Sequence, residues 1–240
     1  YAASYAPFVS MRALEQVRSF IAYPRLDVKL ISGLSGLTGD VEGATHQGIE
    51  DIGIMRSIPN MAVLSPADAA ATKALTFAMA KVKGPVYLRL GRKPSYTVFD
   101  DSYTFAWGKA NLLAADGHDL ALVTTGSMVY RCLEAARLLK DRGIRITLVE
   151  VPCIKPLDVE MLAHVAASCG RVMTVEEHTV CTGLGSAVAQ ALAGVQPVPM
   201  RIMGIEDTFT ESAPYDDLVC KYGLSEGAIA CEAEKWISAP

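Results

Sequence analysis

The sequence predicts an α/β protein of two consecutive domains, each a mostly parallel sheet with helices on both faces. Short apolar, β-branched runs alternate with segments whose apolar residues recur at helical spacing, a pattern typical of parallel sheets. The alternation fades once, over a stretch that contains proline, glycine and paired aspartates, and then resumes. For a chain of 240 residues, we therefore expect a first domain at 1–93, a linker at 94–118 and a second domain at 119–240.

In the first domain, apolar and β-branched runs between turn-forming residues predict buried strands. These runs are Val28–Ser32, Met61–Leu64 and Val86–Leu90. Helical spacing of apolar side chains predicts helices at Phe8–Ala22, His46–Arg56 and Pro66–Val82. Because helical segments separate successive strands, the strands can run parallel to one another.

The second domain repeats the same order of elements. Its predicted strands are Leu120–Thr125, Ile144–Val149, Arg171–Glu176 and Met200–Ile205. Its predicted helices are Leu133–Arg142, Val159–Ala167 and Ser186–Ala193. The same alternation of strands and helices predicts a second sheet of the same kind.

Composition excludes several classes of function. The net charge is −4 and no cluster of Lys or Arg stands out, so we expect neither nucleic acid nor an anionic membrane as a partner. No apolar run reaches the roughly 18 residues that a membrane span needs. The six cysteines are scattered without a Cys-x-x-Cys pair, which is typical of reduced thiols in a cytoplasmic protein. No His-x-x-x-His pattern or carboxylate cluster indicates a metal held by this chain alone.

One histidine stands in a position that suits chemistry. A glycine-rich loop, Leu37–Gly43, leads to His46 at the predicted start of a helix. Such a junction exposes a side chain beside free backbone N–H groups, which favours acid/base or oxyanion chemistry. A histidine that only caps or fills the turn fits the spacing equally well.

Other motifs are weaker. Gly183-Leu-Gly185 hints at a dinucleotide-binding turn, but Val188 stands where the third glycine belongs, so tight helix–strand packing explains the glycines better. His178 follows two glutamates at a strand end, and we interpret it as a solvated or interface-capping residue. The Gly-x-Ser-x-Gly pattern of α/β-hydrolases is absent.

Several stretches together resemble a known family. The chain reads Gly43-Ala-Thr-His-Gln-Gly-Ile-Glu-Asp51, then Met55-Arg56 and Ile58-Pro-Asn-Met61, and this resembles the pyrimidine-binding domain of transketolases. Ser65–Asp68 and Gly84–Arg92 are similar to the segments that follow in that domain. The stretches similar to the family's C-terminal domain are Val175–Thr179, Thr182–Ser186 and Lys221–Leu224. Their order and spacing cover nearly the whole chain.

The resemblance implies a pocket for the aminopyrimidine ring of thiamine diphosphate. Tyr5 would stack on that ring, Phe8 would form a wall of the pocket, and Met11 replaces a third aromatic residue of the family. A flat side chain suits a heteroaromatic ring because it leaves the ring's edges free for hydrogen bonds. By the same resemblance, His46 would bind substrate oxygens and help to move protons.

The resemblance also implies contacts to the substrate. Arg92 matches an arginine that clamps the substrate phosphate, a task suited to the fork of the guanidinium group. Glu42 stands where the family has an aspartate linked to recognition of sugar hydroxyls. Leu34 replaces a second histidine of the family, so the resemblance leaves the preferred sugar open.

One motif of thiamine enzymes is absent. They hold Mg²⁺ and the diphosphate with Gly-Asp-Gly followed by Asn, and this chain has no Gly-Asp-Gly. The chain also begins at Tyr1 without Met, so the first domain looks truncated at its N-terminus. We therefore expect the C-terminal subunit of a split transketolase, or a fragment, that works only in an α2β2 assembly with an N-terminal diphosphate-binding subunit.

The expected reaction moves a two-carbon ketol unit between a ketose and an aldose, with sugars or sugar phosphates as substrates. Two alternatives remain open. One is another thiamine enzyme, similar to deoxyxylulose-phosphate synthase or to the β-subunit of a 2-oxoacid dehydrogenase. The other is a catalytically idle structural or regulatory paralogue.

Overall fold

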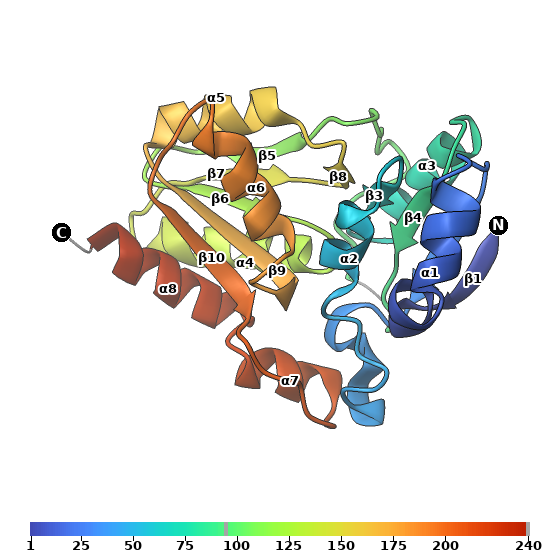
Figure 1. Ribbon diagram of the computed structural model, residues 1–240. Coiled ribbons are helices and arrows are strands. Elements are labelled where there is room, and N and C mark those ends of the chain that lie inside the picture. The colour runs from blue at the N-terminus through green and yellow to red at the C-terminus, as the bar shows by residue number, and fades with distance from the viewer. Residues whose placement is uncertain (94–95, 239–240) are drawn as a thin grey trace.

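A computed structural model describes residues 1–93 and 96–238, which form two five-stranded sheets lying beside each other (Figure 1). The first two residues of the expected linker, 94 and 95, lie outside the described residues, as do the last two of the chain. Four strands of each sheet are parallel and the fifth is antiparallel. The predicted α/β fold of two mostly parallel sheets with helices is confirmed.

The first sheet is built mainly from the N-terminal part of the chain. Its strand order is β1 (Ala2–Tyr5), β2 (Lys29–Gly33), β4 (Val86–Arg89), β3 (Ala62–Leu64) and β8 (Cys153–Lys155). β8 comes from the C-terminal part and pairs antiparallel with β3. β2 and β4 lie in the middle of the sheet, and every side chain of β4 is buried. The carboxyl ends of the parallel strands therefore meet at one edge.

The helical elements of this domain are η1 (Phe8–Arg12), α1 (Leu14–Gln16), η2 (Val17–Ala22), η3 (Gly36–Glu42), α2 (Asp51–Ser57) and α3 (Ala69–Ala80). The first three form the segment predicted as one helix at Phe8–Ala22. Its two ends have π-type turns, in which Ala13 N donates to Phe8 O and Tyr23 N to Arg18 O. The carboxylate of Asp68 caps α3 by accepting from Ala71 N.

The predicted helix at His46–Arg56 begins five residues later than expected, at Asp51. Between His46 and Asp51 the backbone bonds to other segments: Gly48 N donates to Leu34 O, and Gly36 N donates to Gly48 O. These groups are thus used to fasten the segment to the end of β2 and are not available to a helix. His46 consequently lies on a turn and not at a helix start.

The second sheet has the strand order β10 (Met200–Ile205), β9 (Val172–Thr179), β6 (Ala121–Thr124), β7 (Thr147–Glu150) and β5 (Asn111–Ala115). β5 lies within the range 94–118 that the sequence predicts as a linker, and it pairs antiparallel with β7. This part of the range is therefore an edge strand of the second sheet. β9 lies next to β6 and extends to Thr179, near the first domain (Figure 1).

Helices cover both faces of the second sheet. They are α4 (Met128–Asp141), α5 (Val159–Cys169), α6 (Leu184–Ala193), α7 (Tyr215–Lys221) and α8 (Glu226–Ser238). Side chains of β6 and of Leu120 just before it alternate between the faces: Ala121 and Val123 pack with α5 and α6, whereas Leu120 and Leu122 pack with α4 and α8. Within residues 1–93 and 96–238, no helix combines the length and apolarity needed to cross a membrane.

Candidate functional site

Three rings meet at the carboxyl edge of the first sheet. Tyr5 ends β1, Phe8 begins η1, and His46 lies on the turn after η3. The ring centroids are 5.5 Å apart for Tyr5 and Phe8, 5.3 Å for Phe8 and His46, and 6.1 Å for Tyr5 and His46. The Tyr5 side chain is 45% exposed, so one face of this cluster is open to a ligand. Ligands of open parallel sheets commonly bind at this edge.

The His46 ring is held from two sides. Its Nδ1 and the hydroxyl of Thr45 share a hydrogen bond of 2.9 Å, and its ring and that of Phe8 are arranged edge to face with 65° between their planes. The side chain is partly exposed. An imidazole fixed in this way beside an open aromatic surface can exchange a proton with a group bound on that surface.

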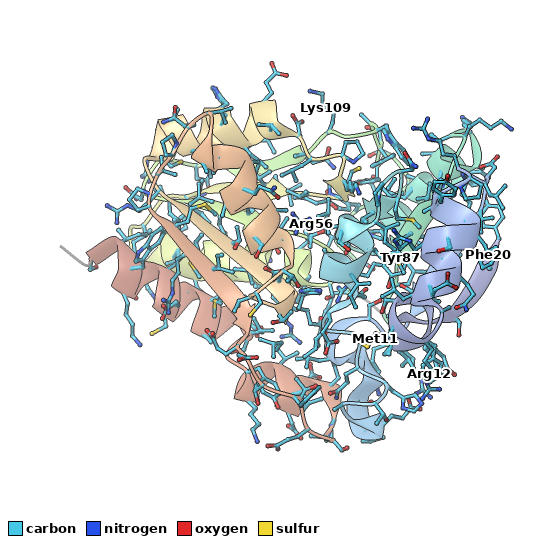
Figure 2. All side chains as sticks on the ribbon, viewed as in Figure 1. Met11, Arg12, Phe20, Arg56, Tyr87 and Lys109 are labelled. Carbon is cyan, nitrogen blue, oxygen red and sulfur yellow. The ribbon has the colours of Figure 1, made fainter. Side chains whose placement is uncertain are left out.

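Met11 lies one helical turn after Phe8 and is 41% exposed. The next residue, Arg12, places its guanidinium carbon 4.2 Å from the centroid of the Phe8 ring. Figure 2 labels both side chains at the lower end of the N-terminal helical segment. Sequence reasoning missed Arg12, although its spacing of four residues from Phe8 on a predicted helix indicates such a contact.

Glu42 and Arg92 form an ion pair at the rim of this edge, with 2.6 Å between Oε1 and Nη1. The hydrogen bond that Arg92 donates to the carboxylate of Glu42 raises the pKa of Arg92 above its ordinary value. Next to this pair, Lys93 pairs with Asp40. Arg92 and Lys93 at the rim are therefore neighbouring cations, and each forms an ion pair with a carboxylate of η3.

Asp40 is the least expected member of this group. Its backbone has φ 56° and ψ −128°, a conformation that favours glycine, and the residue is only 7% exposed. Its Oδ1 has no hydrogen-bond partner among the described residues. Sequence reasoning missed both Asp40 and its partner Lys93, because an ion pair between separate loops leaves no local pattern.

Leu34, which replaces the family's second histidine, is 1% exposed and points into the core. Its backbone has φ 57° and its carbonyl accepts from Gly48 N. The side chain therefore serves packing beneath the site and offers no group to a ligand.

A buried polar network lies behind the site, between the two domains. Arg89 Nε donates to both oxygens of Asp51 at 3.0 and 3.1 Å, and the hydroxyl of Tyr87 donates to the same carboxylate at 2.7 Å. Arg89 Nη2 donates to the carbonyls of Gly48 and Glu177. Burial alone would lower the pKa of Arg89, but the nearby carboxylate of Asp51 raises it. Tyr87 lies on β4, the middle strand of the first sheet, and burial raises its pKa.

His178, at the end of β9, belongs to this network. Its side chain is fully buried, and Nε2 accepts from the backbone N–H of Ile52 at 3.1 Å at the start of α2. Burial lowers the pKa of His178 to about 4. It is thus an interface-capping residue and not a solvated one.

The glycines at Gly183 and Gly185 are explained by packing. The carboxylate of Glu176 accepts from Leu184 N at 2.6 Å and from Gly185 N at 2.8 Å. It fills the N-terminus of α6, where a nucleotide phosphate would otherwise bind. A Cβ at Gly183 would overlap this carboxylate, and one at Gly185 would overlap Ile202.

The arrangement suits a planar heterocycle with a polar substrate beside it. Tyr5 and Phe8 offer aromatic faces, His46 offers a proton-transfer group, and Glu42 with Arg92 offers hydrogen-bonding groups of both charges. Within the part of the chain that the structure describes, no cluster of three His, Cys, Asp or Glu side chains could hold a metal ion. The aromatic faces of Tyr5 and Phe8 suit a planar ring such as the aminopyrimidine of thiamine diphosphate.

Comparison with known proteins gives the family. Residues 1–96 match the transketolase pyrimidine-binding domain, and residues 108–229 match the transketolase C-terminal domain. The fold is of the α/β class with two mostly parallel sheets, and these two matches show that the chain belongs to the transketolase family. The expected membership is confirmed.

The similar proteins identify the subgroup. The chain is 41% identical to a putative transketolase C-terminal section of Methanocaldococcus jannaschii, over 96% of this chain and 72% of that protein. It is 38% identical to the 6-deoxy-6-sulfo-D-fructose transketolase subunit of Clostridium sp., over 97% and 72%. A solved split-gene transketolase, an inactive β4 tetramer, superposes with a TM-score of 0.92 at 40% identity, covering 99% of this chain and 76% of that one. The chain is therefore similar to C-terminal subunits of split transketolases.

Proposed function

We propose that this chain is the pyrimidine-binding and C-terminal subunit of a split, thiamine-diphosphate-dependent transketolase. It transfers a two-carbon ketol unit from a ketose to an aldose. The observation that carries this proposal is the open cluster of Tyr5, Phe8 and His46 at the carboxyl edge of the first sheet. The cluster places aromatic faces, which can bind the ring of the cofactor, beside a histidine, which can exchange a proton with the substrate.

Each member of the cluster has a separate role in this proposal. Tyr5 stacks on the aminopyrimidine ring, Phe8 walls the pocket, and Met11 extends the apolar wall along the exposed side of η1. When bound, thiamine diphosphate supplies the carbanion chemistry. His46 hydrogen-bonds substrate oxygens and moves a proton at its imidazole.

The rim pair recognises the part of the substrate away from the reacting carbons. Arg92 binds an anionic tail through its guanidinium fork. In this structure Oε1 of Glu42 lies 2.6 Å from Nη1 of Arg92. When substrate binds, Glu42 must therefore either share Arg92 with the anionic tail or turn toward the substrate hydroxyls. The similar Clostridium subunit belongs to a transketolase of a sulfonated fructose, which also has an anionic tail.

A partner subunit is part of the proposal because the sequence contains no Gly-Asp-Gly motif and because similar proteins are named as transketolase subunits. The Mg²⁺ and the diphosphate are then held by an N-terminal subunit that carries the Gly-Asp-Gly motif, and the two subunits form an α2β2 assembly. All six cysteines are free thiols, which supports a reducing, cytoplasmic setting.

The test mixes the chain with its N-terminal subunit, thiamine diphosphate and Mg²⁺, and measures ketol transfer from D-fructose 6-phosphate and from D-fructose to a panel of aldoses. We expect turnover in the mixture and none with either subunit alone. Calorimetric titration of the isolated chain with cofactor and Mg²⁺ should show no tight binding. Micromolar binding by the isolated chain would contradict a divided site, and cofactor binding without turnover on any donor would favour an idle paralogue.

A further inference from the structure

The segment Gly36–Gly48, here called the site loop, carries both Glu42 and His46. It leaves β2, forms η3 and returns to the sheet at the isolated bridge between Ser35 and Gly48. The loop belongs to the first domain by sequence, but residues of the second domain contact it near both of its ends. The contacts on each side are made by buried polar groups.

At its start the site loop is bound by Glu177, near the end of β9. The Leu37 N–H donates to Glu177 Oε1 at 2.5 Å, and Glu177 is 2% exposed. The other carboxylate oxygen, Oε2, accepts from the hydroxyls of Ser127 at 2.5 Å and Tyr215 at 2.9 Å. These two hydroxyls lie at the starts of α4 and α7. The carboxylate of Glu177 is therefore held by the second domain on one side and binds the site loop on the other.

The backbone of the loop is shaped to receive this carboxylate. Gly36 has φ 62°, and a Cβ at this position would overlap the Glu177 side chain. Arg89 Nη2 ties the same region together by donating to the carbonyls of Glu177 and Gly48. A side chain at Gly36 would thus push the loop away from β9.

At its end the site loop is bound through Gln47. Its amide nitrogen donates to the carbonyls of Asp40 and Glu211, each at 3.0 Å. Its amide oxygen accepts from the hydroxyl of Thr210, which is 5% exposed. One side chain therefore joins the middle of the loop to the segment before α7.

We propose that Glu177 is a positioning residue of the transketolase reaction: it holds the site loop so that His46 faces the cofactor pocket. The hydrogen bond between Thr210 and Gln47 is a second, weaker contact that holds the same loop. The proposal rests on the proposed function of His46. It assigns the C-terminal domain a role in shaping the active site, since Ser127, Tyr215 and Thr210 all belong to that domain.

The first experiment measures hydrogen–deuterium exchange of the full chain and needs no activity. Glu177→Met keeps the length of the side chain and removes both acceptors, so Leu37 N loses its partner. We expect exchange in residues 36–48 to rise by about tenfold or more, as for the loss of a protecting contact worth about 1.4 kcal/mol. Glu177→Gln is the conservative rescue: its amide oxygen still accepts from Leu37, while the hydroxyls of Ser127 and Tyr215 can accept from its NH2.

Glu176→Met is the matched control. Glu176 is the neighbouring buried glutamate, but its carboxylate binds the start of α6 and not the site loop. We expect its exchange to rise at residues 184–185 and to stay unchanged at 36–48. If Glu177→Met does not fold, Thr210→Val removes one hydroxyl with little change in shape and should raise loop exchange in the same direction, by less.

The second experiment measures kcat and KM of the mixed subunits. Glu177→Met should lower kcat by about tenfold with little change in cofactor affinity, and Glu177→Gln should restore most of it. In a His46→Ala background, Glu177→Met should have less than about a twofold further effect, because the two residues act through one group. Glu176→Met should leave kcat of the folded enzyme unchanged.

The outcomes separate the two proposals. Unchanged loop exchange in Glu177→Met, or in Thr210→Val, overturns the role of the C-terminal domain in holding the loop. If loop exchange is faster but kcat is normal, Glu177 does not position His46, although the proposed ketol transfer still holds. The same conclusion follows if the effects of Glu177→Met and His46→Ala on kcat are fully additive. Absence of ketol transfer by the wild-type mixture contradicts the proposed function and, with it, any positioning role in that reaction.

Discussion

Oε1 of Glu42 lies 2.6 Å from Nη1 of Arg92, so the guanidinium group that is expected to meet the substrate tail already has an anionic partner within its own chain. Both side chains are partly exposed, Arg92 at 54% and Glu42 at 35%. Exposed pairs of this kind contribute little to stability and exchange partners readily. An incoming anion therefore competes with Glu42, and this competition can be measured.

Arg92→Ala should raise KM for D-fructose 6-phosphate by about ten- to a hundredfold, the loss expected for one charge-assisted hydrogen bond of about 1.5–3 kcal/mol. KM for D-fructose should hardly change, since this donor has no anionic tail. Steady-state kinetics of the mixed subunits on both donors give the answer. Equal defects on both donors would mean that Arg92 supports the fold or an interface.

Glu42→Gln should lower KM for D-fructose 6-phosphate, because the tail no longer competes with a carboxylate for Arg92. The amide keeps the size and one acceptor of the glutamate, which makes the variant a control for shape. The same kinetic assay applies. A rise in KM on both donors would instead assign Glu42 to the binding of sugar hydroxyls.

His46→Ala should lower kcat by about a hundredfold or more, the usual effect of losing a general acid/base group, with cofactor binding intact. Calorimetric titration of the mixed subunits with thiamine diphosphate checks the second part. Wild-type turnover in this variant on every accepted donor would remove His46 from the mechanism and leave it as a turn residue.

Tyr5→Ala should weaken binding of thiamine diphosphate to the mixed subunits by about 1–3 kcal/mol, as for other stacked aromatic contacts. Tyr5→Phe is the matched control and should be nearly silent, because the ring face makes the contact. Should affinity be unchanged in Tyr5→Ala, the pocket does not include this residue.

His178 should make stability depend on pH. Burial lowers its pKa in the folded state to about 4 from 6.5, so between these values the unfolded chain binds a proton that the folded chain does not. The free energy of unfolding from this group therefore falls as pH decreases from 6.5 to about 4, by up to about 1.4 kcal/mol per pH unit. Because the side chain of His178→Gln cannot titrate, its free energy of unfolding should lack this dependence on pH. The difference in free energy of unfolding between wild type and this variant should therefore shrink as pH falls. Urea unfolding of both chains across that range measures it, and a constant deficit would show that His178 titrates normally.

Much of the fold follows from periodicity. The central strands β2, β4, β6 and β9 were predictable because each contains a short run of mostly apolar, mostly buried residues. β1 was missed because all four of its residues are exposed, and so no burial pattern marks it. β8 has only three residues and exists through its pairing with β3, a distant contact that no local pattern encodes.

The site divides in a similar way. From spacing alone, His46 is explained equally well as a turn residue. Only the family resemblance predicts that Tyr5, Phe8 and His46 belong to one site. The structure does place the three rings together, but their roles remain proposals. Asp40 escaped prediction because its positive φ is imposed by the surrounding loop and its ion pair with Lys93, not by its own preference.

The pairing of β8 with β3 also bears on how the chain is made. During synthesis, the open side of β3 cannot be covered until Cys153–Lys155 have left the ribosome, well after the rest of the first sheet has emerged. Until then a nascent first domain presents an uncovered strand edge, the kind of surface on which neighbouring nascent chains associate. Late closure of this edge makes translation and folding of the two halves one coupled event, and a chain interrupted between them would be prone to aggregate.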